Sequence, residues 1–190
     1  MQVIVLELHE AAEVQWRLTC VRFDEWLRND LFRARWWLLL LLYIVCAYVW
    51  WKTVDKARLK EIVLYTALII IIILSLDELG EELTLWDYPV DIFPLFPPIS
   101  AIDFACMPLI YSLIYQHFRT WKSFTIVTFA MAVIFCFICE PIFVLLGIYQ
   151  PLTWKYWYGL PIYFSMALGI KAAVILFYRI AEKAGGKAPT

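Results

Sequence analysis

The sequence lacks the short motifs by which many enzymes bind phosphate or activate a nucleophile. It contains no glycine-rich phosphate loop, no Ser-His-Asp arrangement and no long low-complexity run. A charge excess is also missing, because 16 basic and 17 acidic residues leave a formal net charge of -1. Without an excess of basic residues we expect no nucleic-acid partner.

Disulfide bonds and a cleavable leader are not indicated either. The five cysteines are an odd number, and four of them lie in apolar runs, where thiols pack as small hydrophobic groups. The N-terminal stretch, MQVIVLELHEAAEVQW, is acidic rather than basic and has no short apolar core before a small-residue cleavage site. We therefore expect no signal peptide, and we expect the first membrane helix to act as its own signal.

Apolar residues are abundant instead. Hydrophobic residues make up 64% of the chain and aromatic residues 18%, and the mean hydropathy is +0.74. These values exceed what one soluble core requires. At 190 residues the chain is long enough for one compact bundle. The composition therefore predicts an all-α integral membrane protein whose main partner is the lipid bilayer.

The first 35 residues are predicted to form an amphipathic helix. Glu13 pairs with Arg17 and Asp24 with Arg28 at i,i+4 spacing, away from the apolar face. Such a helix lies in the membrane interface or docks on a partner protein. The apolar face would comprise Leu8, Ala12, Trp16, Cys20, Phe23, Leu27 and Leu31.

Five apolar segments follow, and each is about long enough to cross a hydrocarbon core of ~30 Å at ~1.5 Å per residue. We expect transmembrane helices over residues 36–54, 62–80, 99–117, 124–146 and 160–178, and a disordered tail over 181–190. Basic residues follow the first, third and fifth segments, which predicts that these ends are cytoplasmic and that the N-terminal helix is external.

The predicted external side is rich in proline and in acidic and aromatic residues. The stretch LWDYPVDIFPLFPP (85–98) is expected to form a stiff, non-helical cap, because proline fixes φ and lacks an amide donor. The segments LTLWDY (83–88) and LTWKY (152–156) are similar in sequence. An internal repeat and coincidence explain this similarity equally well.

Ionisable residues inside the apolar segments are the candidate functional residues. Glu140 precedes Pro141 in an otherwise uncharged run, so a carboxyl group and a helix irregularity meet at membrane depth. Counting from the segment ends places Asp77, Asp103 and Glu140 at one level, about 22–24 Å from the cytoplasmic face. Lys171 lies near the midplane, and its flexible stem makes it the expected counter-ion.

Two interpretations of these four residues remain open. In one, they form a satisfied interhelical network that specifies packing. In the other, they line an outward-facing polar site that binds a proton or a small cation. No metal site and no cofactor are predicted, because Cys136 and Cys139 have no second cysteine pair and no histidine nearby.

Several motifs in a fixed order cover most of the chain: RWW (35–37), WWKTVDKARLKEI (50–62), LDELGEELTLWDYP (76–89), FPLFPP (93–98), Asp103, YQHFRTWKSF (115–124), CEPIFVLLGIY (139–149) and WKYWYGLPIY (154–163). On these motifs the chain resembles an uncharacterised family of small integral membrane proteins of endospore-forming Firmicutes. The resemblance implies a plasma-membrane location and a multi-helix fold, without an established activity. A looser similarity to small-subunit carotenoid cyclases covers isolated motifs only.

Three functions are compatible with the sequence. The first is proton- or cation-coupled transport or sensing at the intramembrane site, with the bundle forming a homo-oligomer or joining a membrane-protein partner. The second is an enzyme that acts on an isoprenoid or another lipid, with Glu140 as a general acid. The third is a non-catalytic assembly subunit of a membrane complex. Of the three, we expect the first, which is not an enzyme.

Overall fold

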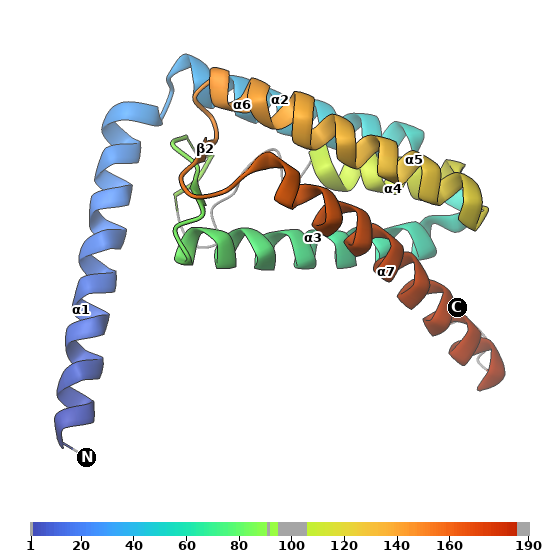
Figure 1. The fold of residues 1–190 in the computed structure, drawn as a ribbon, viewed down its shortest axis with the longest axis horizontal. Coiled ribbons are helices and arrows are strands. Elements are labelled where there is room, and N and C mark those ends of the chain that lie inside the picture. The colour runs from blue at the N-terminus through green and yellow to red at the C-terminus, as the bar shows by residue number, and fades with distance from the viewer. Residues whose placement is uncertain (1, 91, 95–105, 186–190) are drawn as a thin grey trace.

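The computed structural model describes residues 2–90, 92–94 and 106–185, most of which are helical (Figure 1). Two strands of two residues each form the only sheet within these residues. In chain order the elements are α1 (Gln2–Glu25), a π-helical turn (Trp26–Asp30), α2 (Ala34–Thr53), a 3-10 turn (Lys56–Arg58), α3 (Leu59–Glu82), β1 (Trp86–Asp87), α4 (Met107–His117), α5 (Trp121–Ile134), a second π-helical turn (Phe135–Cys139), α6 (Glu140–Leu145), β2 (Gln150–Pro151) and α7 (Tyr156–Lys183).

Four helical segments in the described part of the chain are long and apolar enough to cross a membrane: Ala34–Thr53, Lys56–Glu82, Trp121–Leu145 and Tyr156–Lys183. They support a multi-pass, all-α membrane protein. The third predicted span, 99–117, is described only as α4, and 99–105 lies outside the described residues. The 11 residues of α4 rise about 16 Å, roughly half of a hydrocarbon core. Among the described residues four spans are therefore found, and the remaining predicted span, 99–117, lies partly outside them.

The N-terminal segment is helical, but a single apolar face is not confirmed. At about 100° per residue, Val14, Leu18 and Val21 lie roughly opposite Trp16 and Phe23, and all five side chains are exposed. Apolar side chains thus occupy two sides of α1, where one side was predicted. Figure 1 shows that α1 extends away from the other helices.

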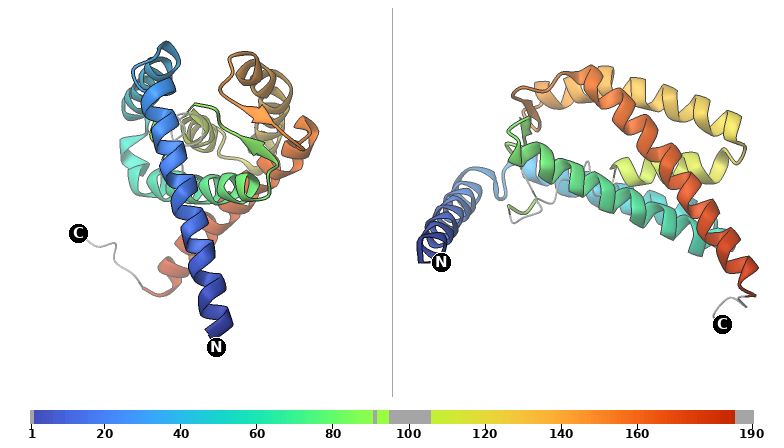
Figure 2. Two further views of the ribbon diagram at one scale, coloured as in Figure 1. Left: turned by 90° about the vertical axis from the view of Figure 1, so that its left-hand side faces the viewer. Right: turned by 60° about the horizontal axis from the view of Figure 1, so that its bottom comes forward.

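The short helix α4 occupies the centre of the bundle. It contacts α2, α3 and α5, and Figure 2 shows it enclosed when the molecule is viewed end-on. Seven of its 11 residues are buried, including Tyr111 and Tyr115. The Tyr115 ring stacks on Tyr65 of α3 with centroids 4.1 Å apart, and the Tyr111 hydroxyl donates to the carbonyl oxygen of Tyr163 on α7. The longer helices surround this core and expose their outer apolar side chains, as helices in lipid do.

The two ends of the bundle differ in chemistry. At one end, here called the basic end, α2 ends and α5 begins, and Gln116 of α4 bonds the backbone of Thr53 and Asp55. At the other, here called the capped end, β1 pairs antiparallel with β2, with Trp86 opposite Pro151. The amide groups of residues 152–154 all donate to the carbonyl oxygen of Leu85 at 2.9–3.1 Å. The described part of the predicted cap is therefore non-helical and hydrogen-bonded across two segments.

The irregularity predicted at Pro141 lies just before it. The helix that runs from Trp121 to Leu145 changes to a π-helical turn over Phe135–Cys139 and returns to α-helix at Glu140. Proline has no amide hydrogen and its ring crowds the carbonyl of the residue four positions earlier, so regular α-helical bonding is interrupted there. The wider turn directly precedes Glu140 in the chain, so it affects the direction in which the Glu140 side chain projects from the helix.

Candidate functional site

Glu140 is a buried acid held by a tyrosine of another helix. Its side chain is 3% exposed, although it lies on a helix whose outer side chains face lipid. The Tyr163 hydroxyl of α7 donates to Glu140 Oε1 at 2.9 Å. An acid at this position would be costly without such a donor. The contact joins α6 to α7 and fixes the carboxyl group inside the bundle.

Asp77 is held in the same way, by a tyrosine of the cap. The Tyr88 hydroxyl donates to Asp77 Oδ1 at 3.0 Å. Asp77 belongs to the last turns of α3, and Tyr88 follows β1, so this bond ties the cap to the bundle. The sequence had indicated Asp77 but neither tyrosine, because 11 tyrosines in a membrane protein are expected first as interfacial anchors.

The structure brings Asp77 and Glu140 together at one cavity of about 30 Å³, the space of a water-sized occupant. The two carboxyl groups come from helices more than 60 positions apart in sequence. Every other side chain that lines this carboxylate cavity is aromatic: Trp86, Tyr88, Phe135, Phe143, Tyr149, Trp154 and Tyr163. The cavity thus combines two acids with an aromatic wall and includes no basic side chain among its lining residues.

Gly159 lets α7 approach the carboxylate cavity closely. A Cβ atom at this position would lie 2.8 Å from Tyr163 Cε2, 3.1 Å from Cys136 Sγ and 3.3 Å from Glu140 Oε1. These separations are at or below ordinary van der Waals contact, so a larger residue would displace the tyrosine or the acid. Glycine is therefore required here for space.

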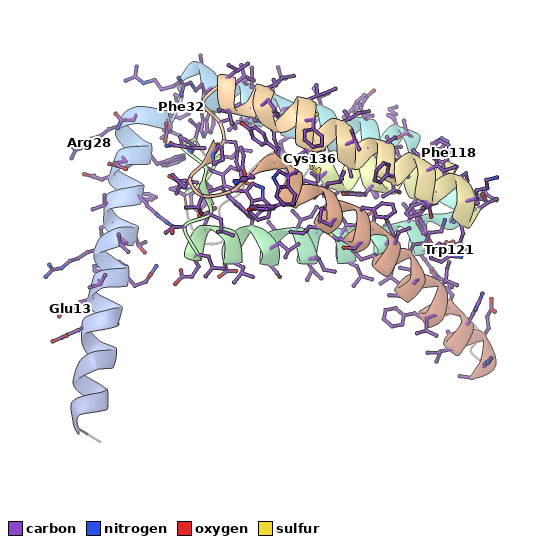
Figure 3. All side chains as sticks on the ribbon, viewed as in Figure 1. Glu13, Arg28, Phe32, Phe118, Trp121 and Cys136 are labelled. Atoms are coloured by element: carbon purple, nitrogen blue, oxygen red, sulfur yellow. The ribbon has the colours of Figure 1, made fainter. Side chains whose placement is uncertain are left out.

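Lys171 does not reach the carboxylates, which corrects its expected role as their counter-ion. Its ammonium group donates to the carbonyl oxygens of Phe118 and Arg119, at 3.2 and 3.0 Å, and lies 4.0 Å from the centre of the Phe124 ring. Phe118 lies at the basic end of the bundle (Figure 3). The stem extends towards the nearest free carbonyl groups, at the end of α4, where a cation is favoured.

Asp103, the fourth predicted site residue, lies outside the described residues. The structure therefore brings together two of the four candidates, Asp77 and Glu140, and places Lys171 elsewhere.

A second polar cluster, not found from the sequence, lies at the basic end. Arg58 forms a two-pronged contact with Glu61, at 2.7 and 3.1 Å, and the Tyr115 hydroxyl donates to the same carboxylate. The i,i+3 spacing of Arg58 and Glu61 was the available signal. This cluster links α3 to the core helix α4.

An acidic pocket lies between the cap and the end of α1. It has a volume of about 230 Å³, and Tyr88 lines both this pocket and the carboxylate cavity. Burial raises the pKa of Asp30, which Arg35 opposes and Glu25 reinforces. The lining consists of Arg22, Glu25, Trp26, Asp30, Glu81, Asp87, Tyr88, Pro89 and Pro94. We call it the acidic vestibule, since it contains four acids and one base.

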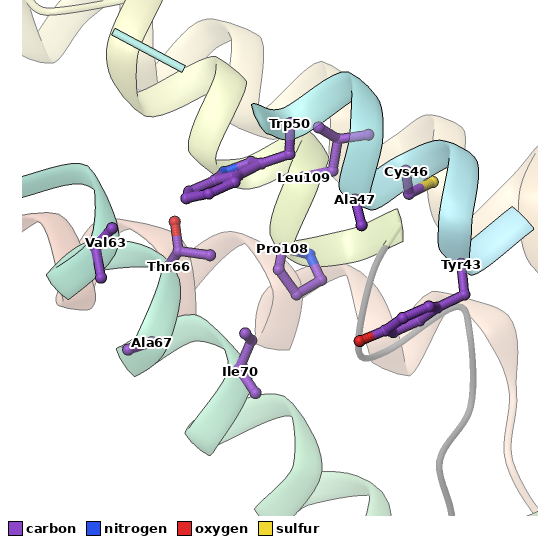
Figure 4. Close-up of a pocket in the computed structure, with 10 residues that line it drawn as sticks. All are labelled: Tyr43, Cys46, Ala47, Trp50, Val63, Thr66, Ala67, Ile70, Pro108 and Leu109. Carbon is purple, nitrogen blue, oxygen red and sulfur yellow. The ribbon is translucent and has the colours of Figure 1, made fainter. Parts of the chain in front are cut away.

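Two further cavities among the described helices are mainly apolar. One, of about 130 Å³, lies between α3, α4 and α7 and shares Asp77, Trp86, Trp154 and Tyr163 with the carboxylate cavity. We call it the apolar chamber. The other, of about 300 Å³, is a groove between α2, α3 and α4 that is lined mainly by apolar side chains (Figure 4). The groove contains neither Asp77 nor Glu140.

Cys136 and Cys139 are both free thiols in the described structure. The described residues contain no group of three or more His, Cys, Asp or Glu side chains suited to holding a metal ion. Comparison with protein-family models, with curated proteins and with solved structures gives no match, so the site must be interpreted from its own geometry.

Proposed function

We propose that this chain is a plasma-membrane protein that takes up a proton or a small cation at Asp77 and Glu140, for coupled transport or for sensing. The observation that carries the proposal is the position of Tyr88. It lines the acidic vestibule outside and the carboxylate cavity inside, and its hydroxyl bonds Asp77. Tyr88 is the one lining residue that the two spaces share, so its displacement is the step by which we propose that they become connected.

Electrostatics supports uptake at this cavity. Two carboxylates that share a small, aromatic-walled space repel each other far more strongly than they would in water. A proton or a cation between them removes that repulsion. The four acids of the vestibule raise the local concentration of cations at its mouth. Vestibule and cavity together form a route for a positive charge from the capped end, which we assign to the cell exterior.

Proton uptake by purified protein in liposomes tests the proposal. A pH step outside the vesicles should produce uptake or flux in the wild type, and both Asp77→Asn and Glu140→Gln should reduce it at least tenfold. Glu82→Gln is the matched control, since Glu82 is an exposed acid at the end of α3. Equal uptake in both site variants and the wild type would overturn the proposal.

A second candidate, an enzyme acting on an isoprenoid or another lipid, is favoured by the apolar chamber beside the carboxylates. Glu140 would then donate a proton to substrate as a general acid in a site that excludes water. Conversion of an added lipid to a product, abolished by Glu140→Gln, would support this candidate. Proton uptake without any lipid conversion would exclude it in favour of the first.

A further inference from the structure

The apolar chamber contains a hydrogen-bond donor that the fold does not use. Trp86 lines the chamber, and its indole Nε1 is buried without an acceptor within the described part of the protein. An indole N–H in an apolar space normally finds a partner, because a buried donor that is left unbonded loses the hydrogen bond it would make to water. The ring itself is firmly seated, against Gly80 and against Trp154 with centroids 4.7 Å apart. The donor is therefore held in place beside an apolar space.

The same chamber is also lined by an acceptor. Asp77 lines the chamber as well as the carboxylate cavity, and its carboxyl oxygens accept hydrogen bonds. A group placed between Trp86 and Asp77 would thus meet one donor and one acceptor. A hydroxyl group both accepts and donates, whereas a carbonyl or an ether oxygen only accepts. The polar contacts of the chamber therefore match a hydroxyl group.

The rest of the chamber matches a hydrocarbon. Its volume of about 130 Å³ is close to that of cavities that hold a molecule of about six carbon atoms. Leu79 and Leu83 line it and are 54% and 56% exposed, so the chamber reaches the outer surface of α3. In a membrane this surface faces lipid near the capped end. A longer chain can therefore extend from the chamber into the bilayer.

We propose that the apolar chamber binds the hydroxyl-bearing end of a long-chain lipid alcohol, with the oxygen between Trp86 and Asp77 and the chain leaving past Leu79. The inference rests on the proposed function in that it assigns a ligand class to the same site: the bound hydroxyl lies next to the two carboxylates. The groove between α2, α3 and α4 is larger, but its indole donor, Trp50 Nε1, already bonds Ser112 Oγ.

Photolabelling of the protein in liposomes tests the inference, with a long-chain alcohol that carries a diazirine near the hydroxyl. Labelled peptides should cover the end of α3 and the start of α7. Unlabelled hexadecanol should compete, and hexadecane should compete much less. Trp86→Phe keeps an aromatic ring but removes the donor, so it should weaken labelling about threefold to tenfold and abolish the preference for the alcohol.

Two matched variants of α3 separate binding from folding. Leu79→Trp fills the mouth of the chamber and should remove the labelling. Ile71→Trp adds the same side chain at an exposed position that lines neither the chamber nor the groove, and should leave it intact. Both variants should elute like the wild type in size-exclusion chromatography. Labelling that persists in Leu79→Trp, or that hexadecane and hexadecanol suppress equally, would overturn the inference.

The outcome is independent of the proton-uptake test. Uptake that requires Asp77 and Glu140, without any specific photolabelling, would leave the proposed function standing and remove the lipid alcohol. Specific labelling in a protein that takes up no proton would support the binding of a lipid alcohol and would remove the proposed proton uptake.

Discussion

The position of the Glu140 carboxyl group depends on one hydrogen bond and one close approach between helices. This carboxyl group is fixed by one tyrosine hydroxyl, and that tyrosine is close to the acid because residue 159 has no side chain. The site thus depends on a glycine that has no side chain to form a hydrogen bond or to carry a charge. Two tyrosines, Tyr88 and Tyr163, supply the donors that make the partly buried Asp77 and the buried Glu140 tolerable.

Gly159→Ala should disturb the site without changing its charge. The new methyl group would overlap Tyr163 and press on Glu140, so we expect the Tyr163–Glu140 bond to break and the free energy of unfolding to fall by about 1–3 kcal/mol. Thermal unfolding in detergent and proton uptake in liposomes measure the two effects.

The matched control is Gly169→Ala on the same helix. A Cβ at Gly169 has no neighbour within 4 Å, so this change should be neutral or should stabilise α7 by up to about 1 kcal/mol. If the two alanine variants behave alike, the close approach at Gly159 has no energetic importance.

At the scale of the elements, Lys171 joins α7 to the end of α4. Its two backbone contacts satisfy carbonyl groups that the last turn of a helix leaves open, and three aromatic rings surround the ammonium group. Both observations assign Lys171 a structural role at the basic end, remote from the carboxylate cavity.

Lys171→Met keeps the length of the side chain and removes the charge. We expect the free energy of unfolding to fall by about 1–3 kcal/mol, because the carbonyl groups of Phe118 and Arg119 lose a charged donor. Proton uptake at Asp77 and Glu140 should be unchanged after correction for the amount of folded protein. A counter-ion would behave differently, since its removal would alter proton binding at the carboxylates directly.

The elements also show how far the sequence could predict the site. Hydropathy located the four long helices, and counting residues placed Asp77 and Glu140 near a common level. Counting gives the height of a Cα atom, but it does not give the direction of a lysine stem, which here depends on where α4 ends. The tyrosine partners were equally inaccessible, because they meet the acids only through the pairing of β1 with β2 and the crossing of α6 with α7.

At the scale of the whole molecule, the two ends of the bundle carry different kinds of polar and charged side chains. Acidic and aromatic side chains gather at the capped end, and the Arg58–Glu61 cluster and Lys171 lie at the basic end. The start of α2 and the end of α7 lie at opposite ends of the bundle (Figure 1). The carboxylates lie at the capped end, which is the end from which we propose that the positive charge enters.

The helix α1 adds a surface beyond the bundle. Its exposed apolar residues on two sides, such as Val14 and Trp16, are suited to burial on more than one side. We propose a second copy of the chain or another membrane protein as its partner. The acidic vestibule includes residues at the end of α1, so such a partner would lie next to the entrance of the site.

Infrared difference spectroscopy of the protein in liposomes tests the central claim most directly, namely that Asp77 and Glu140 act as one proton-binding unit. Mild acidification leaves exposed carboxylates ionised, so a new band of a protonated carboxyl group must come from a site that binds protons more readily. The account predicts such a band in the wild type, its loss or shift in both Asp77→Asn and Glu140→Gln, and its retention in Lys171→Met and Glu82→Gln. An absent band, or a band unaffected by either site substitution, would contradict it.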